Sequence, residues 1–258
     1  MNTTTLDDTY STAAATGGGD IHSIKKQARF AGLLYLLLGI TAPVALMYVP
    51  SKLIVAGDAT ATAERIRNSE GLLRLGIGTE LFHQVTVIFL TLALYQLFKA
   101  VNQRQAALLV VLGSLVSVPI MFANVLNDVA ALTLAKGAPF LAVFERAELD
   151  ALSYLFVRLH SNGITVASIF WGLWLIPFGI LVIQSRFIPR FLGYLLFIAG
   201  GAYVLSAFST LVLPAIRPFV DQFALLFEMG ELPIIFWLLI WGAKEQRRRA
   251  NAPAPLAG

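Results

Sequence analysis

The stretch FWGLWLIPFGILVIQSRFIPRFLGYLLFIAG (residues 170–200) contains two apolar blocks separated by the short basic segment QSRFIPR. An α-helix rises about 1.5 Å per residue, so about 20 apolar residues cross the hydrocarbon core of a bilayer. Both blocks reach that length with their apolar neighbours, and Arg186 and Arg190 lie between them. The stretch therefore predicts two membrane-spanning helices joined by a short basic loop.

The same alternation of apolar blocks and short charged loops continues along the chain of 258 residues. Hydrophobic residues make up 57% of the chain and charged residues only 13%, whereas soluble domains carry about 25% charged residues. This composition is typical of a polytopic helical membrane protein and argues against a soluble domain. We predict an all-α transmembrane helix bundle with six spans, at residues 30–50, 75–98, 106–134, 159–184, 190–214 and 220–243.

Prolines and glycines inside the predicted spans indicate where helices bend and where they pack closely. Pro119 and Pro177 lie in the third and fourth spans, and each removes a backbone hydrogen bond, which predicts kinks. Gly172 and Gly179 lie among tryptophans in the fourth span. We expect the glycines to be points of close helix contact and the tryptophans to anchor the span at the interface.

Lysine and arginine residues predict the orientation of the chain. The loops that we assign to the inside are short and basic, whereas the outer loops mix basic with acidic residues, and cytoplasmic loops carry the Lys/Arg excess. We therefore expect a protein of the cytoplasmic (inner) membrane with both termini in the cytoplasm. Residues 1–24 are predicted to be a disordered cytoplasmic tail, 25–243 the transmembrane domain, and 244–258 a basic, Pro/Ala-rich cytoplasmic tail.

Two outer segments predict short helices outside the membrane. In residues 57–74, Asp58 is suited to cap a short polar helix. Residues 139–160 place apolar side chains at helical spacing opposite acidic ones, which predicts an amphipathic helix. This helix could lie on the outer leaflet, extend the fourth span, or pack on the mouth of the bundle.

Polar and titratable residues within four of the spans are the candidate functional residues. Measured at about 1.5 Å per residue, they lie about 20 to 39 Å from the cytoplasmic ends of their helices, in the outer half of the membrane. Ionisable groups in membranes almost always face the protein interior or a wet cavity. We expect one outward-opening polar cavity, lined by the second, third, fourth and sixth spans, with Glu231 as its floor. The candidate residues are Glu80, His83, Asn124, Asn127, Asp128, His160, Glu228 and Glu231.

Two kinds of chemistry fit these residues. Neighbouring carboxylates in a low dielectric, such as Glu228 and Glu231, can share a proton or act as acid and base. The Glu-x-x-His pattern of Glu80 and His83, with Asp128, is a possible metal-binding set. Di-iron bundles carry that pattern twice and this chain carries it once, so the sequence predicts no cofactor and leaves a metal as an alternative.

A purely structural role also fits the same residues, because polar pairs join helices within membranes. Three arginines lie at the level of the acidic groups and could neutralise Glu80, Glu228 or Asp128. They are Arg74, Arg158 and Arg217. The chain has no cysteine, which excludes disulfides and cysteine-ligated metals.

Five stretches of the chain carry a resemblance to a known family. They are ARFAGLLYLLLGI (28–40), GDATATAERIRNSEGLLRLGI (57–77), LTLALYQLFKAVN (90–102), IFWGLWLIPFGILVIQSRFIPRFLGYLLFIAG (169–200) and GELPIIFWLLIWG (230–242). Together they resemble a bacterial membrane-protein family called domain of unknown function 4386. The resemblance covers residues 25–243 and implies a six-span protein of the cytoplasmic membrane, but it implies no activity, cofactor or substrate.

The residues favour a membrane protein whose polar cavity, near the outer leaflet, binds or moves a small or lipid-like ligand. The alternatives are an intramembrane acid–base or metal-dependent enzyme acting on a membrane-soluble substrate, and a non-catalytic membrane subunit or scaffold. The expected partners are the lipid bilayer and that ligand, and nothing in the sequence indicates a protein partner. The net charge of +4 is spread over separate loops, which argues against a nucleic-acid partner.

Overall fold

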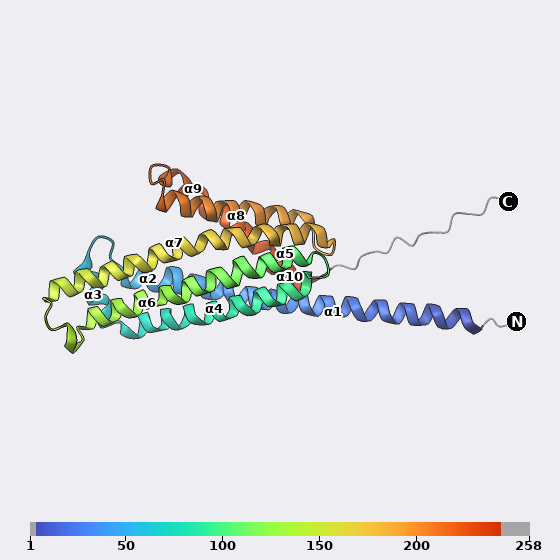
Figure 1. Cartoon of the computed structure of the whole chain (residues 1–258), viewed down its shortest axis with the longest axis horizontal. Coiled ribbons are helices and arrows are strands. Elements are labelled where there is room, and N and C mark those ends of the chain that lie inside the picture. The colour runs from blue at the N-terminus through green and yellow to red at the C-terminus, as the bar shows by residue number, and fades with distance from the viewer. Residues whose placement is uncertain (1–3, 244–258) are drawn as a thin grey trace.

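A computed structural model describes residues 4–243 of the chain, and their side chains from residue 23 onward. The secondary-structure elements in this part of the chain are all helices, and most of them lie lengthwise beside one another (Figure 1), which confirms the predicted all-α class. Short π-helical and 3₁₀ turns interrupt some of the long segments. The α-helices are α1 (Thr4–Pro43), α2 (Val49–Leu53), α3 (Ala59–Asn68), α4 (Glu70–Phe98), α5 (Gln103–Val110), α6 (Ser117–Lys136), α7 (Arg146–Ser185), α8 (Arg190–Leu211), α9 (Arg217–Glu228) and α10 (Leu232–Ile240).

Six helical segments are long and apolar enough to cross a membrane, as the sequence predicts. Their surfaces support that assignment: Leu126 and Leu226, for example, are 66% and 68% exposed, and exposed apolar side chains in such number suit lipid rather than water. The orientation of the six segments relative to the two sides of the membrane stays a prediction. The segments are Ser23–Leu53, Glu70–Phe98, Gln103–Lys136, Arg146–Ser185, Arg190–Leu211 and Arg217–Ile240.

Local capping determines where α3 and α7 begin. The Asp58 side chain accepts a hydrogen bond from Ala61 N at 2.8 Å and begins α3, as predicted. The amphipathic segment 139–160 is not a separate helix, because a capping box formed by Glu145 and Glu148 begins α7, which continues to Ser185. Of the three arrangements that the sequence allows for this segment, the structure has the one that extends the fourth span.

The division of the chain into a disordered tail, 1–24, and a transmembrane domain, 25–243, stays a prediction. In the structure, the helix α1 begins at Thr4 and projects beyond the other helices (Figure 1). Once a helix is nucleated in the first span, each further residue adds a backbone hydrogen bond, so elongation is easier than nucleation. The predicted carboxyl-terminal tail, 244–258, lies outside the described residues.

Two prolines coincide with π-helical turns in the membrane segments. The turn Val44–Tyr48 precedes Pro50, and the turn Val111–Val116 precedes Pro119. Proline lacks the N–H that would bond to the carbonyl four residues earlier, and in both cases that carbonyl lies within the π turn. At Pro119, therefore, the expected irregularity takes the form of a wider turn. The helix α7 runs through Pro177 without interruption.

Glycines bring α7 and α8 into close contact. A methyl group at Gly172 would lie 2.5 Å from the carbonyl oxygen of Gly200, and one at Gly179 would lie 2.8 Å from that of Gly193. The contacts are reciprocal, so these four glycines form two facing pairs. On each helix, the two glycines are seven residues apart. The prediction that Gly172 and Gly179 are contact points is confirmed, and the partners are glycines of the next span.

Buried apolar side chains form two clusters along the bundle. One contains Leu73 of α4 and Ala131 of α6, and the other contains Leu94 of α4 and Phe178 of α7. Along α4 and α7, the candidate polar residues fall between the two clusters. At the far end of the second cluster, Arg29 Nη2 donates to the carbonyl of Ile240 at 3.1 Å, which joins the first span to the last.

Two adjacent glycines of α8 test the packing against α7. Gly200→Ala should lower the thermal unfolding midpoint of the purified protein, because its methyl group would lie 2.7 Å from the Gly172 carbonyl oxygen, and such overpacking costs about 1–3 kcal/mol. Gly201 has open space around it, so Gly201→Ala should leave the midpoint unchanged or raise it slightly through helix propensity. Equal effects of the two substitutions would contradict the facing-glycine interface.

Candidate functional site

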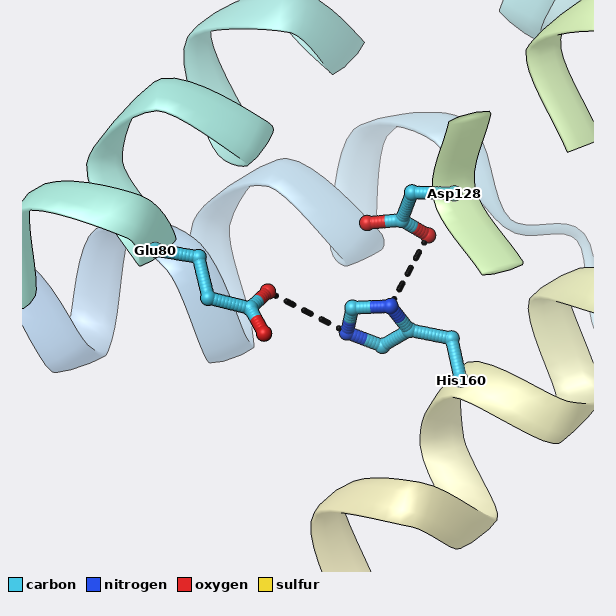
Figure 2. A group of neighbouring side chains, drawn as sticks. All are labelled: Glu80, Asp128 and His160. Carbon is cyan, nitrogen blue, oxygen red and sulfur yellow. Dashed lines mark ion pairs between the residues drawn. The ribbon is translucent and has the colours of Figure 1, made fainter. Parts of the chain in front are cut away.

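A histidine lies between two carboxylates where α4, α6 and α7 meet (Figure 2). His160 Nε2 lies 3.3 Å from Glu80 Oε2, and His160 Nδ1 lies 3.1 Å from Asp128 Oδ1. Glu80 and His160 are only 3% and 8% exposed. Both ring nitrogens therefore face an acidic oxygen, in an environment where an unpaired charge is costly.

Contacts between α6 and α7 hold this group in place. Asn124 Nδ2 donates to the backbone carbonyl of His160 at 2.9 Å, and Asn127 Nδ2 donates to Asn124 Oδ1 at the same distance. A side chain at Gly163 would collide with the Asn124 amide. Because Gly163 lies one turn after His160, the absence of a side chain there lets Asn124 reach the backbone and fix the imidazole between the carboxylates.

Space and unused acceptors adjoin the group. A cavity of about 230 Å³ is lined by Glu80, Asp128 and His160 together with residues of the first span. Glu80 Oε1 and Gln84 Oε1 are buried and accept no hydrogen bond from the described residues. A buried oxygen without a donor costs about 1–3 kcal/mol, so water, a cation or a ligand donor would stabilise this site.

The side chains of this group fit a metal ion. One atom from each of Glu80, Asp128 and His160 lies within 4.8 Å of the other two, and imidazole with carboxylates is a donor set for divalent transition metals. The sequence predicts His83 as the histidine of this set, whereas in the structure the histidine beside Glu80 and Asp128 is His160. His83 Nδ1 instead lies 2.7 Å from Thr41 Oγ1 of α1. Spacing along α4 predicts a shared face for Glu80 and His83, but it carries no information on which histidine α7 brings nearer.

A second cavity, of about 310 Å³, lies toward the other apolar cluster. Glu228 and Glu231 line it, where a 3₁₀ turn (Met229–Glu231) joins α9 to α10 in the sixth span. The Tyr35 hydroxyl, from α1, donates a hydrogen bond to Glu231 Oε1, and Tyr203 of α8 also interacts with this carboxylate. Apolar side chains from α1, α7 and α10 form much of the remaining wall.

A narrow space separates the two cavities. Glu80, His83 and Gln84 line it, together with Ala45 and Leu46 of the π turn in the first span. The sequence predicts one cavity with Glu231 as its floor, whereas the structure divides the candidate residues between two. Asp128 and His160 line the first cavity, and Glu228 and Glu231 line the second. The first span borders both, which the sequence does not indicate, since that span carries no charged residue between Arg29 and Lys52.

The three arginines do not neutralise the acidic residues within the bundle. Arg74 pairs with Glu70 at 2.7 Å, and Arg217 pairs with Asp221 at 3.2 Å. In both cases the partner is one turn away on the same helix, the closest approach that a helix surface offers. Arg158 is exposed and forms no ion pair with the residues that the structure describes. The charge pairing predicted for Arg74, Arg158 and Arg217 is therefore corrected.

The sequence did not indicate Tyr35, Trp171 and Tyr203 as wall residues of the second cavity, nor Thr41 as the partner of His83. Each is uncharged and lies in an apolar run, where aromatic and hydroxyl side chains are also common in helix packing. A signal existed for Tyr35, because it lies in a stretch, 28–40, on which the family resemblance rests. It did not indicate which face of the helix would meet Glu231.

Six apolar segments with a buried Glu/Asp/His group define a multi-pass membrane protein. The chain belongs to the family described as Domain of unknown function (DUF4386), whose family model matches residues 30–242, as the resemblance predicts. No curated protein and no solved structure matches the chain.

Proposed function

We propose that the protein binds a small or lipid-like ligand, soluble in the membrane, in the cavity at Glu231, and that it holds or moves this ligand within a cytoplasmic membrane, with both termini in the cytoplasm. The observation that carries the proposal is the cavity itself. It has a volume of about 310 Å³, a largely apolar wall and a few convergent polar groups. Those are the properties of small-molecule sites, which commonly lie between the helices of bundles.

A purely structural role explains this cavity less well. Polar residues that only join membrane helices satisfy one another and need no space between them. Glu231 has a donor in Tyr35, yet it and Glu228 border an open volume instead of a packed interface. An ionisable residue at such a position is costly to keep, and a ligand would supply a reason to keep it.

The first test concerns what the protein retains on purification. Mass spectrometry of gently purified wild-type protein should detect a bound small molecule or lipid-like compound. Glu231→Gln should lose most of it, because the substitution keeps the side-chain shape and removes the carboxylate. The matched control is Glu64→Gln on α3, an exposed carboxylate away from the cavity, which should retain the compound. Identical retained material in wild type and Glu231→Gln would contradict the proposal.

A second function, metal-dependent or acid–base chemistry on a membrane-soluble substrate, is favoured by the group around His160. The three donors have a geometry that a divalent ion can use, and Glu80 has a spare buried oxygen. A metal there would act as a Lewis acid on a substrate in the adjoining cavity of about 230 Å³. Without a metal, the same carboxylates and imidazole are suited to accept and donate protons.

Metal analysis separates this second function from the first. If it holds, protein purified without chelators should contain about one transition-metal ion per chain, as three protein ligands and an open position allow. His160→Gln should lose the ion, whereas His83→Gln should keep it, because His83 contacts Thr41 and not the carboxylate group. A wild-type protein without stoichiometric metal, also after dialysis against Zn²⁺ or Mn²⁺, would exclude the metal-dependent form.

A further inference from the structure

The ionisable groups of the Glu231 cavity are mostly acidic. Two carboxylates, Glu228 and Glu231, line it, and His83 is the remaining ionisable side chain of its wall apart from tyrosines. Among the described residues that form this wall, none is a lysine or arginine. Carboxylates in a low dielectric need a partner for their charge, and the wall offers hydroxyl donors but no permanent cation.

Four aromatic rings from three helices also face this space. Tyr35 packs against Trp174 with ring centroids 5.8 Å apart, and Trp171 meets Tyr203 at 6.5 Å in an edge-to-face contact. These contacts fix the rings before any ligand enters. The faces of tryptophan and tyrosine attract cations within about 6 Å, most strongly where water is excluded.

From these two observations together we infer that the ligand of the Glu231 cavity is an organic cation, an ammonium group carried on an apolar body. The charged end would lie near Glu231 and Glu228 among the rings of Trp171 and Tyr203. The apolar body would lie along Leu38 and Ile235, which line the same cavity. This inference rests on the proposed function and adds the chemical class of the ligand.

Other classes of ligand fit the wall less well. An anion would meet two carboxylates with no lysine or arginine to offset them. A neutral lipid would leave the carboxylates without a charged partner. A small inorganic cation prefers a shell of oxygen ligands, whereas aromatic and aliphatic side chains make up most of this wall. An organic cation uses both the carboxylates and the rings.

The cavity also has an edge that such an amphiphile can reach from the bilayer. Leu225 of α9 and Met229 line the cavity and are 62% and 50% exposed. Leu46, of the first span, lines the cavity as well. An apolar molecule that bears one positive charge partitions into membranes, so it can approach along this exposed edge.

The test compares two ligands of nearly the same shape. Benzyltrimethylammonium carries a permanent positive charge, and its carbon analogue neopentylbenzene does not. Binding to the full-length protein in lipid nanodiscs is measured by equilibrium dialysis. The cation should bind more tightly than the analogue. Glu231→Gln should lower the affinity for the cation on the order of tenfold or more and leave the affinity for the analogue unchanged. Glu64→Gln, on the exposed helix α3, should change neither.

A pair of substitutions at Tyr203 keeps the test decisive if Glu231→Gln does not fold. Tyr203→Phe retains the aromatic face and should retain most of the affinity for the cation. Tyr203→Leu removes the aromatic face and should lower the affinity for the cation more than that for the neutral analogue. Circular dichroism of each variant confirms its helical fold.

Three results would overturn the inference. They are equal affinity for the cation and its neutral analogue, a cation affinity that neither Glu231→Gln nor Tyr203→Leu lowers, and no binding of the cation at all. Binding of the neutral analogue alone would overturn the cation class and leave the proposed ligand cavity standing. The proposed function itself fails on a different result, namely retained material that is identical in wild type and Glu231→Gln.

Discussion

An ionised side chain that faces lipid costs about 2.5–3.5 kcal/mol or more, and this cost decides where Glu80, Asp128 and Glu231 can lie. The structure meets the constraint in two ways. Glu80 and Asp128 share one imidazole, that of His160, between α4, α6 and α7. Glu231 has a tyrosine donor and borders a cavity. In both places, an ionisable group for which facing lipid is costly is held by side chains from neighbouring spans.

The rest of the bundle keeps these polar groups apart from the tightly packed regions. Apolar clusters lie on both sides of the His160 group, and facing glycines close the contact between α7 and α8. The π turns before Pro50 and Pro119 then widen the first and third spans where the cavities lie, since Leu46 and Gly113 belong to these turns and line the second cavity. π turns are frequent at functional sites, and here they leave space beside the polar residues.

Much of the architecture could be predicted from the sequence because it follows from local rules. Span lengths follow from apolar runs, the Asp58 cap from its neighbours, and the contacts at Gly172 and Gly179 from residue size. The partner of each polar group could not be predicted in this way. Periodicity places Glu80 and His83 on one side of a helix, but only the packing of α7 against α6, permitted by Gly163, brings His160 to the carboxylates. Likewise, Tyr35 is uncharged and lies in an apolar run, so the sequence does not indicate that its hydroxyl donates to Glu231.

Whether the cavity at Glu231 is open inside the membrane domain can be measured directly, because the chain contains no cysteine. Gly39 lines the cavity at Glu231, and Gly201 lies on the outside of α8 with open space around it. Single cysteines at these positions, in protein held in a bilayer, are treated with a water-soluble thiol reagent, which requires the thiolate. Gly39→Cys should react, whereas Gly201→Cys, which faces lipid, should not. An unreactive Gly39→Cys in a correctly folded protein would contradict an open cavity at Glu231.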